Sequence, residues 1–388
     1  MKSKGTESKI KESKIKESKN IAIAGEITPS KTIIPVIERL RELEKEDKLS
    51  FKLNKIIGLY HGESSKAFLE PYCDEVYSIG EGRRGKKNST GKLALLISKD
   101  ILKSYNALKG KDTDLLITAG NAGDVRKAIV AANILRIPVL HIEQDIYNPI
   151  EVISQANLFT VPSEDYKEYL EKNYQLKNVV NINGYPMAKY VDNQIKEGSL
   201  IDKDEIYGEY GMKEFVLVVL GGDLREEDIE PLIRSVEELN LKALIAPYRF
   251  DRNMVQDLVL SPNIKILPQY VDLLSFMNAA SHLIYAAGMG MTIEAGVFNI
   301  PSLKIEGFHK THGSVDLAKE LNIPIVKIDE IPNAFENLPE QKESDLVKNS
   351  EIAIEKLVDL INEFDEKTLK RSGFKSTKEI WNSRKEFR

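Results

Sequence analysis

Cysteine is almost missing from this chain, because its 388 residues include only Cys73. A single cysteine excludes an intramolecular disulfide framework and a cysteine-based metal cluster, and it fits a reducing cytoplasm best. We expect Cys73 to be a small core residue rather than a nucleophile. The chain also lacks an apolar run near the ~20 residues that span a bilayer. Its charged N-terminus has no apolar segment of the kind found in signal peptides, so we expect a cytoplasmic protein.

Basic residues do not outnumber acidic residues either. The 55 Lys and Arg are outnumbered by 60 Asp and Glu, for a net charge of −5, so nucleic acid is not an expected partner. Two short segments are exceptions. Residues 1–20 repeat the unit ESKIK with seven Lys against three Glu, and we expect a disordered tail, with weak binding to anionic lipid as the alternative. Residues 82–87 (GRRGKK) are expected to be a solvated loop, and the alternative is contact with the phosphate of a lipid-linked acceptor.

Residues 21–190 alternate short apolar runs with segments of helical spacing. The expected strands are residues 21–24, 56–60, 75–79, 115–118, 139–142, 158–161 and 179–182. The expected helices are residues 32–43, 64–71, 125–135 and 166–172, with Pro35 in the first turn of the first helix. This alternation predicts an α/β fold built on a doubly wound parallel sheet.

The pattern stops over residues 184–210, which are polar and show no sustained apolar face, and then restarts. The second set of expected strands is residues 215–220, 243–246, 264–267, 283–287 and 323–328, with helices at residues 228–239, 271–279, 291–299, 344–364 and 377–387. We therefore expect two Rossmann-like doubly wound domains, residues 21–190 and 213–345, joined by a linker at residues 191–212 and followed by C-terminal helices at residues 346–388. Two such domains face a central cleft between the carboxyl ends of their strands, where ligands bind.

The most informative stretch is SHLIYAAGMGMTIEAGVFNIPSL, residues 281–303. An uncharged strand ends at residue 287, Gly288 and Gly290 interrupt the apolar run, and a helix follows. The free N–H groups of such a helix start favour an anion, most often a phosphate. Glu294 is expected in about the first turn of this helix, and it is either a simple partner of the helix dipole or an acceptor for both hydroxyls of a ribose. A packing turn with a dipole-stabilising glutamate remains an equal alternative at this point.

A second glycine turn, Gly221-Gly222-Asp223, directly follows the buried run FVLVVL. Two adjacent glycines are a weak signal alone, and a tight strand-to-helix turn explains them equally well. Their position adds weight, because this is the first such turn of the second sheet and Gly288 lies in a later one. Both turns are expected to open toward the same edge.

The order of these motifs resembles the donor-binding half of GT-B glycosyltransferases, and of the MurG-like group that uses UDP-N-acetylglucosamine in particular. The matching segments are GGD (221–223), PQYVD (268–272), AAGMGMTIEAGVFNIPSL (286–303) and FHK (308–310). In the first half, GNAG (120–123), IPVLHIEQD (137–145), FTVPSE (159–164) and INGYPM (182–187) resemble the acceptor half, with Glu143 and Gln144 matching its Glu-Gln pair. The resemblance covers residues 213–330 well and residues 110–190 moderately.

The resemblance implies roles for individual residues. Glu294 would bind the ribose diol, and the backbone near Tyr270 and Val271 would lie near the uracil. The diphosphate would be held by backbone at the two glycine turns, namely Gly221, Gly222, Asp223, Gly288, Met289, Gly290 and Met291. Thr292, His309, Asn121 and Gln144 complete the substrate-binding set. Helix starts that face the diphosphate stabilise the charge on departing UDP, so no metal and no cofactor are expected.

The sequence departs from the family in two places. The family opens with a glycine-rich loop that ends in His, whereas this chain reads GEITPS at residues 25–30. Gly313 and Ser314 stand where the family has paired glutamines that touch the donor sugar. The sugar and the acceptor therefore do not carry over. For the catalytic base we propose Glu26 first, since it lies in the first turn facing the cleft, and then Asp124 and Glu143; helix capping is the simpler role for Glu26.

These motifs favour a UDP-sugar-dependent glycosyltransferase that moves an N-acetylhexosamine, with inversion, onto a glycan or lipid-linked acceptor in cell-envelope or glycoconjugate synthesis. A C-terminal helix that crosses back to the first domain is also implied. The alternative is an enzyme similar to UDP-N-acetylglucosamine 2-epimerases, whose His-x-Glu matches His141 and Glu143, although the arginine of their opening turn is absent. A third interpretation is a non-catalytic sugar-nucleotide-binding subunit. His309 and His312 are not expected to bind metal, because no acidic or cysteine partner lies at ligand spacing.

Overall fold

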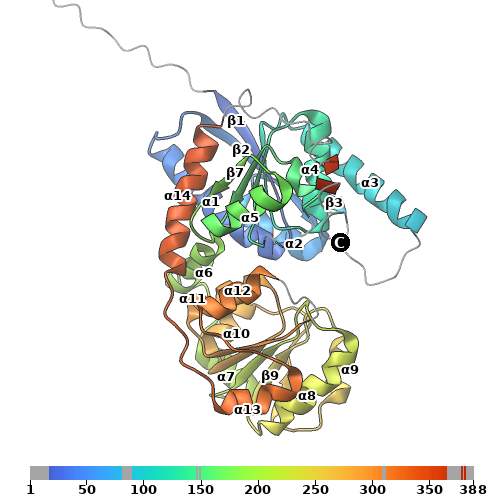
Figure 1. Cartoon of the computed structure of the whole chain (residues 1–388), viewed down its shortest axis with the longest axis vertical. Helices are drawn as coiled ribbons and strands as arrows, with labels where there is room; N and C mark the ends of the chain where they lie inside the picture. Colours follow the sequence, from blue (N-terminus) through green and yellow to red (C-terminus); the bar gives the residue numbers. More distant parts are fainter. Residues whose placement is uncertain are drawn as a thin grey trace, which may run out of the picture.

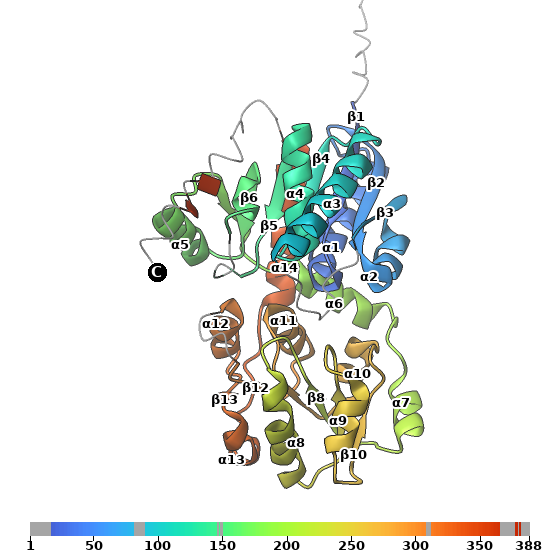
Figure 2. The same ribbon diagram turned by 90° about the vertical axis from the view of Figure 1, so that its right-hand side faces the viewer.

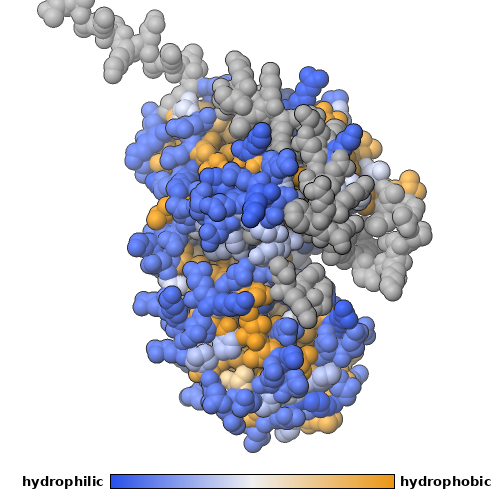
Figure 3. Space-filling model, viewed as in Figure 1, coloured by the Kyte–Doolittle hydropathy of each residue, from blue (hydrophilic) through white to orange (hydrophobic). Residues whose placement is uncertain are grey.

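The computed structural model describes residues 17–80, 90–145, 147, 150–307, 312–364, 377, 378, 380 and 381. These residues form two parallel sheets, of seven and six strands, in two lobes that lie one above the other (Figures 1 and 2). The expected α/β fold of two doubly wound domains is confirmed. Hydrophilic residues cover most of the face shown in Figure 3. Within the described residues no helix has the length and apolarity to cross a membrane.

The first lobe is built on the seven-stranded sheet, ordered β3-β2-β1-β4-β5-β6-β7. Its strands are β1 (Ser18–Ala24), β2 (Lys52–His61), β3 (Glu75–Gly80), β4 (Leu115–Ala119), β5 (Val139–Ile142), β6 (Leu158–Val161) and β7 (Val179–Asn181). Its helices are α1 (Ile27–Lys45), α2 (Gly62–Leu69), α3 (Thr90–Lys109), α4 (Gly123–Leu135) and α5 (Glu164–Tyr174). The strand order reverses between β1 and β4, and in open parallel sheets ligands bind at such a switch point.

The second lobe is built on the six-stranded sheet, ordered β10-β9-β8-β11-β12-β13. Its strands are β8 (Val216–Val219), β9 (Ala243–Ala246), β10 (Ile264–Ile266), β11 (His282–Tyr285), β12 (Ser302–Ile305) and β13 (Ile325–Val326). The helices of this half are α6 (Met187–Lys196), α7 (Lys203–Tyr210), α8 (Ile229–Glu238), α9 (Arg252–Leu258), α10 (Leu273–Ala279), α11 (Met289–Phe298), α12 (Gly313–Glu320), α13 (Ile331–Glu336) and α14 (Leu346–Asn362). Here the order reverses between β8 and β11.

The strand β1 shows why the first sheet is covered on both faces. Successive side chains of a strand point to opposite faces. Ile21 and Ile23 lie in the hydrophobic cluster that includes α1 and α14, whereas Ala22 and Ala24 lie in the cluster that includes α4. A strand that is buried on both faces is apolar at every position, which is why the run IAIA carries no polar residue.

Several elements differ from the sequence-based expectation, and β2, for example, begins at Lys52, four residues before its expected start. α1 begins at Ile27, so Pro35 lies inside the helix and Pro29 takes the first-turn position, where a missing N–H costs little. β1 begins at Ser18, three residues before the expected start of order. The expected connection at residues 184–210 contains α6 and α7, and Met187 and Val191 of α6 are fully buried. Because α6 packs against α1, α11 and α14 together, its apolar residues do not form one stripe.

Further helices and one strand were not expected, namely α3, α9, β12, α12 and α13. α14 matches the expected helix at residues 344–364, and it packs against α1 of the first lobe. The basic segments 1–16 and 82–87 and most of the helix expected near residues 377–387 lie outside the described residues. The domain boundaries stay a prediction.

Candidate functional site

The two glycine turns of the second lobe lie directly against each other. They follow β8 and β11, the neighbouring strands at which the strand order reverses. A Cβ on Gly221 would lie 2.0 Å from the carbonyl oxygen of Ala286, so only glycine fits there. The backbone N–H of Asp223 donates to that same carbonyl at 3.3 Å. A Cβ on Gly222 would meet nothing within 4 Å, which leaves its backbone open to a ligand.

Helix α11 starts at Met289, two residues earlier than expected, with Gly288 as its N-cap. Gly288 offers no side chain, and no side chain of the described residues caps the helix, so its first N–H groups are available to an anion. Glu294 is the sixth residue of α11, beyond the first turn in which a carboxylate interacts strongly with the dipole. This position favours a ligand-binding or pairing role for Glu294 over dipole stabilisation.

A buried lysine that the sequence analysis missed joins the two turns. The ammonium of Lys304, in β12, donates to the carbonyl oxygen of Ala287 at 2.5 Å and lies 4.0 Å from the carboxylate of Asp223. Lys304 is 2% exposed, and this burial lowers its pKa to about 8, although Asp223 and then Asp145 act in the opposite direction. A lysine within the apolar strand SLKI was the signal in the sequence, since lysine is rarely buried without a partner.

The first lobe meets α11 through the start of α1. Lys31 of α1 forms an ion pair with Glu294 at 2.6 Å, and both side chains are largely buried. The methyl group of Thr28 lies 2.5 Å from the position that a Cβ on Gly290 would occupy. The glutamate expected to bind a ribose therefore holds a cation from the opposite lobe.

Two of the three candidate bases lie together at the switch point of the first sheet. Glu26 occupies the N-cap position of α1, where its side chain makes no capping hydrogen bond. Asp124 is in the first turn of α4, and His61 is the last residue of β2. The three side chains each place one ligand atom within 4.8 Å of the others. Asp124 is fully buried, and burial, followed by the charge of Glu26, raises its pKa to about 7. Burial, followed by the charge of Lys127, lowers the pKa of His61 to about 4.

Glu143, the third candidate base, is held inside a turn. One of its oxygens accepts from the backbone N–H groups of Gln144 and Asp145, each at 2.9 Å, and the other lies 3.4 Å from His141. Gln144 donates to the hydroxyl of Thr32 in α1. These residues are buried, so the Glu-Gln pair connects β5 to α1 in this conformation.

The expected substrate-binding residues Asn121 and Thr292 are also engaged. The side-chain oxygen of Asn121 accepts from Arg126 at 2.6 Å, and the hydroxyl of Thr292 lies 3.1 Å from that of Tyr285. Both stay predictions as ligand contacts.

A second connection between the lobes involves His312, the N-cap of α12. Its Nε2 lies 2.7 Å from a carboxylate oxygen of Asp145, whose other oxygen accepts from the N–H of Gly313 at 3.0 Å. Burial raises the pKa of Asp145, but the hydrogen bond and charge of His312 outweigh it and hold this pKa below its ordinary value. The sequence analysis found no acidic partner for His312, because Asp145 belongs to the other lobe. His309 lies outside the described residues.

Two exposed tyrosines border the second lobe after β9 and β10. Tyr270 is 77% exposed and Tyr248 is 54% exposed. Tyr248, which the sequence analysis missed, has φ +54, a strained conformation for an aromatic residue. Gln269 donates to the carbonyl oxygens of Tyr248 and Phe250 and so connects the two loops. Exposed rings of this kind suit stacking against a base, and the uracil contact near Tyr270 stays a prediction.

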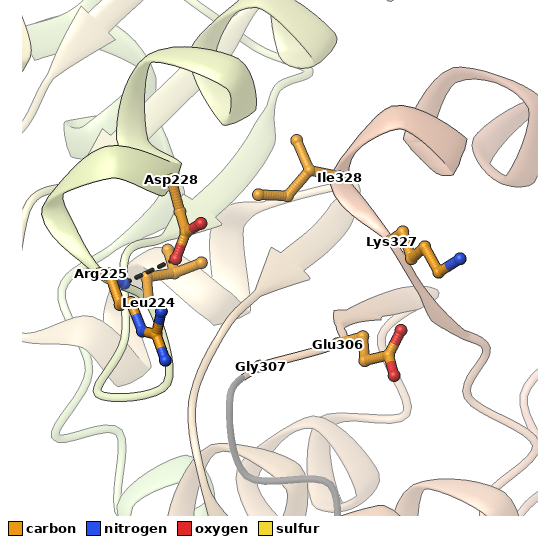
Figure 4. Close-up of a pocket in the computed structure, with 7 residues that line it drawn as sticks. All are labelled: Leu224, Arg225, Asp228, Glu306, Gly307, Lys327 and Ile328. Carbon is orange, nitrogen blue, oxygen red and sulfur yellow. Dashed lines mark hydrogen bonds between the residues drawn. The ribbon is translucent and has the colours of Figure 1, made fainter.

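A separate pocket of about 360 Å³ adjoins the first glycine turn (Figure 4). The side chains around it come from the ends of β8, β12 and β13, and they are Leu224, Arg225, Asp228, Glu306, Lys327 and Ile328, with Gly307. Its charges are mixed, so it suits a diphosphate less well than the uncapped start of α11 does.

Comparison with known proteins supports the architecture. No protein-family model and no curated protein sequence matches the chain. Solved structures do. UDP-GlcNAc 2-epimerase of Methanocaldococcus jannaschii, in complex with UDP-GlcNAc and UDP, superposes with a TM-score of 0.68 at 15% identity, over 88% of this chain and 99% of that chain. The corresponding enzyme of Neisseria meningitidis, bound to UDP-GlcNAc, gives 0.66 at 15% identity, over 88% and 100%. Acinetobacter baumannii MurG gives 0.51 at 14% identity, over 89% and 100%.

The fold is GT-B. At these identities the likeness shows the fold alone. The MurG-like assignment expected from the sequence is not confirmed. Within the GT-B fold, both switch points described above face the junction of the lobes, where α1 contacts α11 and Asp145 contacts His312.

Proposed function

We propose that this GT-B protein is an enzyme that binds a UDP-sugar between its lobes, with the nucleotide on the second lobe. The observation that carries the proposal is the contact between the turns after β8 and β11, beside the uncapped start of α11. Backbone N–H groups and the ammonium of Lys304 supply positive charge for a diphosphate there. Glu294 would bind the ribose diol after exchanging its partner Lys31, and Tyr270 and Tyr248 would contact the uracil.

The first candidate reaction is glycosyl transfer. A hydroxyl oxygen of the acceptor attacks the anomeric carbon of the sugar, and the bond from that carbon to the diphosphate oxygen breaks, with inversion. Glu26 takes the proton of the hydroxyl, and UDP leaves with the electron pair of the broken bond. The start of α11 stabilises the charge on UDP, so this departure requires neither a metal ion nor a cofactor. We propose a glycan or lipid-linked acceptor bound to the first lobe.

The second candidate reaction is epimerisation at C2 of the sugar. It is favoured by the higher TM-scores of the two 2-epimerases and by the paired acids Glu26 and Asp124, which could exchange a proton with that carbon. Incubation in heavy water separates the reactions. Deuterium at C2 of UDP-N-acetylhexosamine marks an epimerase, whereas release of UDP that depends on an added acceptor marks a transferase.

Binding of UDP, measured by titration calorimetry, tests the nucleotide site. Hydrogen bonds to a charged group contribute about 1.5–3 kcal/mol each, so Glu294→Gln should weaken binding by roughly 10- to 100-fold. Glu320→Gln is the matched control, because Glu320 is an exposed residue on α12 of the same lobe. Equal affinity in both variants would remove Glu294 from the site. Glu26→Gln should leave UDP binding intact and abolish turnover.

A further inference from the structure

We propose that Glu26, His61 and Asp124 bind a divalent transition-metal ion at the switch point of the first sheet. No metal site was expected from the sequence, because these residues are separated by 35 and 63 positions. They meet because β2, β1 and β4 are neighbours in the sheet and each residue lies at or just after the carboxyl end of one strand. The proposal is independent of the proposed function, since metal binding is measured without any nucleotide.

The spacing of the three side chains suits a metal ion. Their ligand atoms all lie within 4.8 Å of one another. Bonds of about 2.0–2.2 Å to one ion place neighbouring ligand atoms roughly 3–4 Å apart, so each pair needs to close by roughly 1–2 Å at most. A change of side-chain rotamer supplies a movement of that size without moving the strands.

The second observation is that the cluster contains polar atoms without partners. The Oδ2 atom of Asp124 has no hydrogen-bond partner among the described residues, and at least one ring nitrogen of His61 has none either. His61 is 5% exposed and Asp124 is 0% exposed, and buried polar atoms of this kind are rarely left unsatisfied. Oδ1 of Asp124 is occupied, since it accepts from the N–H of Val125 at 2.9 Å, which leaves Oδ2 for another partner.

Charge balance points the same way. Glu26 and Asp124 bring two carboxylates together, that of Asp124 fully buried and that of Glu26 more exposed. Lys127 influences both Asp124 and His61, and its ammonium is already paired with Asp100 at 2.5 Å. Buried charges are normally paired or bound to a metal. One divalent cation would neutralise the two carboxylates and give the unpartnered nitrogen and oxygen a ligand role.

The ligand set selects the type of metal. One imidazole with two carboxylates suits Zn²⁺, Co²⁺, Ni²⁺ or Mn²⁺, whereas Ca²⁺ and Mg²⁺ prefer oxygen ligands alone. Three protein ligands leave a further position for water or substrate, as in catalytic zinc sites. Glu26 is the most exposed of the three, so water or a substrate hydroxyl would reach the ion from its side.

The test uses the full chain without a histidine tag, treated with chelator and then titrated with Zn²⁺ by calorimetry and with Co²⁺ by visible absorption. We expect one ion per chain, unaffected by excess Mg²⁺. Loss of a residue that only hydrogen-bonds to a metal ligand changes metal affinity by about 10–100-fold, so loss of a ligand in His61→Asn or Asp124→Asn should weaken binding by about 100-fold or more. The matched controls are His282→Asn, on β11 of the second lobe, and Asp165→Asn, on the surface of α5.

Three outcomes would overturn the proposal: no stoichiometric binding of either ion, unchanged binding in both cluster variants, or displacement by Mg²⁺. Circular dichroism checks that each variant is folded. If a variant is not folded, the X-ray absorption spectrum of the zinc-loaded natural chain decides, because the proposal requires one imidazole and two carboxylates around the ion. A spectrum with only water and carboxylate oxygens contradicts it.

Discussion

Replacement of Lys304 by methionine gives the sharpest test of how the two glycine turns are held. The ordinary lysine pKa of 10.5 falls to about 8 in the folded chain, because burial disfavours the charged form. A difference of about 2.5 between the two pKa values corresponds to about 3 kcal/mol of free energy. Below pH 8 the folded state carries this full cost, since both states bind the proton.

Between pH 8 and 10.5 the folded state has released the proton while the unfolded chain still binds it. The free energy of unfolding therefore rises with pH in this window, by about 2 kcal/mol from pH 7.5 to pH 9.5 for this single group. Lys304→Met removes the rise. Urea denaturation of both proteins at the two pH values measures it, and Lys265→Met, at an exposed strand position, is the control that keeps it.

The same lysine makes a prediction for ligand binding. A diphosphate at the start of α11 would raise the pKa of Lys304 again, so UDP binding should take up a proton above pH 8. Calorimetry in two buffers of different ionisation enthalpy detects that proton. If wild type and Lys304→Met show the same pH dependence of stability and the same proton uptake, the argument that Lys304 is a buried, titrating cation is wrong.

Three further predictions concern single positions. Gly221→Ala should lower the free energy of unfolding of its lobe by about 3 kcal/mol or more, because the new Cβ would collide with a backbone carbonyl. Gly222→Ala is the control and should change this free energy by less than about 0.5 kcal/mol. Equal effects of the two substitutions would contradict the packing described. Burial raises the pKa of the Cys73 thiol to about 12. Iodoacetamide at pH 8 should therefore alkylate Cys73 roughly a thousandfold more slowly than a free cysteine. Rapid labelling of the folded chain would contradict the raised pKa. Lys31→Met leaves Glu294 buried without its cation and should cost about 3 kcal/mol in urea denaturation, which Lys31→Met combined with Glu294→Gln should partly restore.

Local patterns were sufficient for the fold class and for every described strand except β12. The apolar runs of β4, β5, β6 and β9 match their expected positions within one residue, because strands buried on both faces leave an uninterrupted apolar signal. α6 was missed for the opposite reason. It contacts three helices at once, so its apolar residues do not follow one helical stripe.

The candidate site was predictable only where its residues are close in sequence. Both glycine turns were found from the sequence, and the structure places them in contact. The partners of the site residues were not found, since Lys31 and Glu294 are 263 positions apart and Asp145 meets His312 from the other lobe. Lys304 is the exception, because a lysine inside an apolar strand is visible without any structure.

The return of α14 to the first lobe affects the order in which the chain acquires structure. Its residues Ala353, Leu357 and Ile361 complete the same hydrophobic cluster as Ile21 and Ile23. β7 ends at Asn181 and α14 begins at Leu346, so 165 positions separate them. At about 5–20 residues per second, a ribosome needs roughly 10–30 s to bridge that interval. During synthesis the face of the N-terminal sheet that α14 covers stays partly exposed until almost the whole polypeptide has emerged. A truncated chain that ends before Leu346 would expose that face permanently.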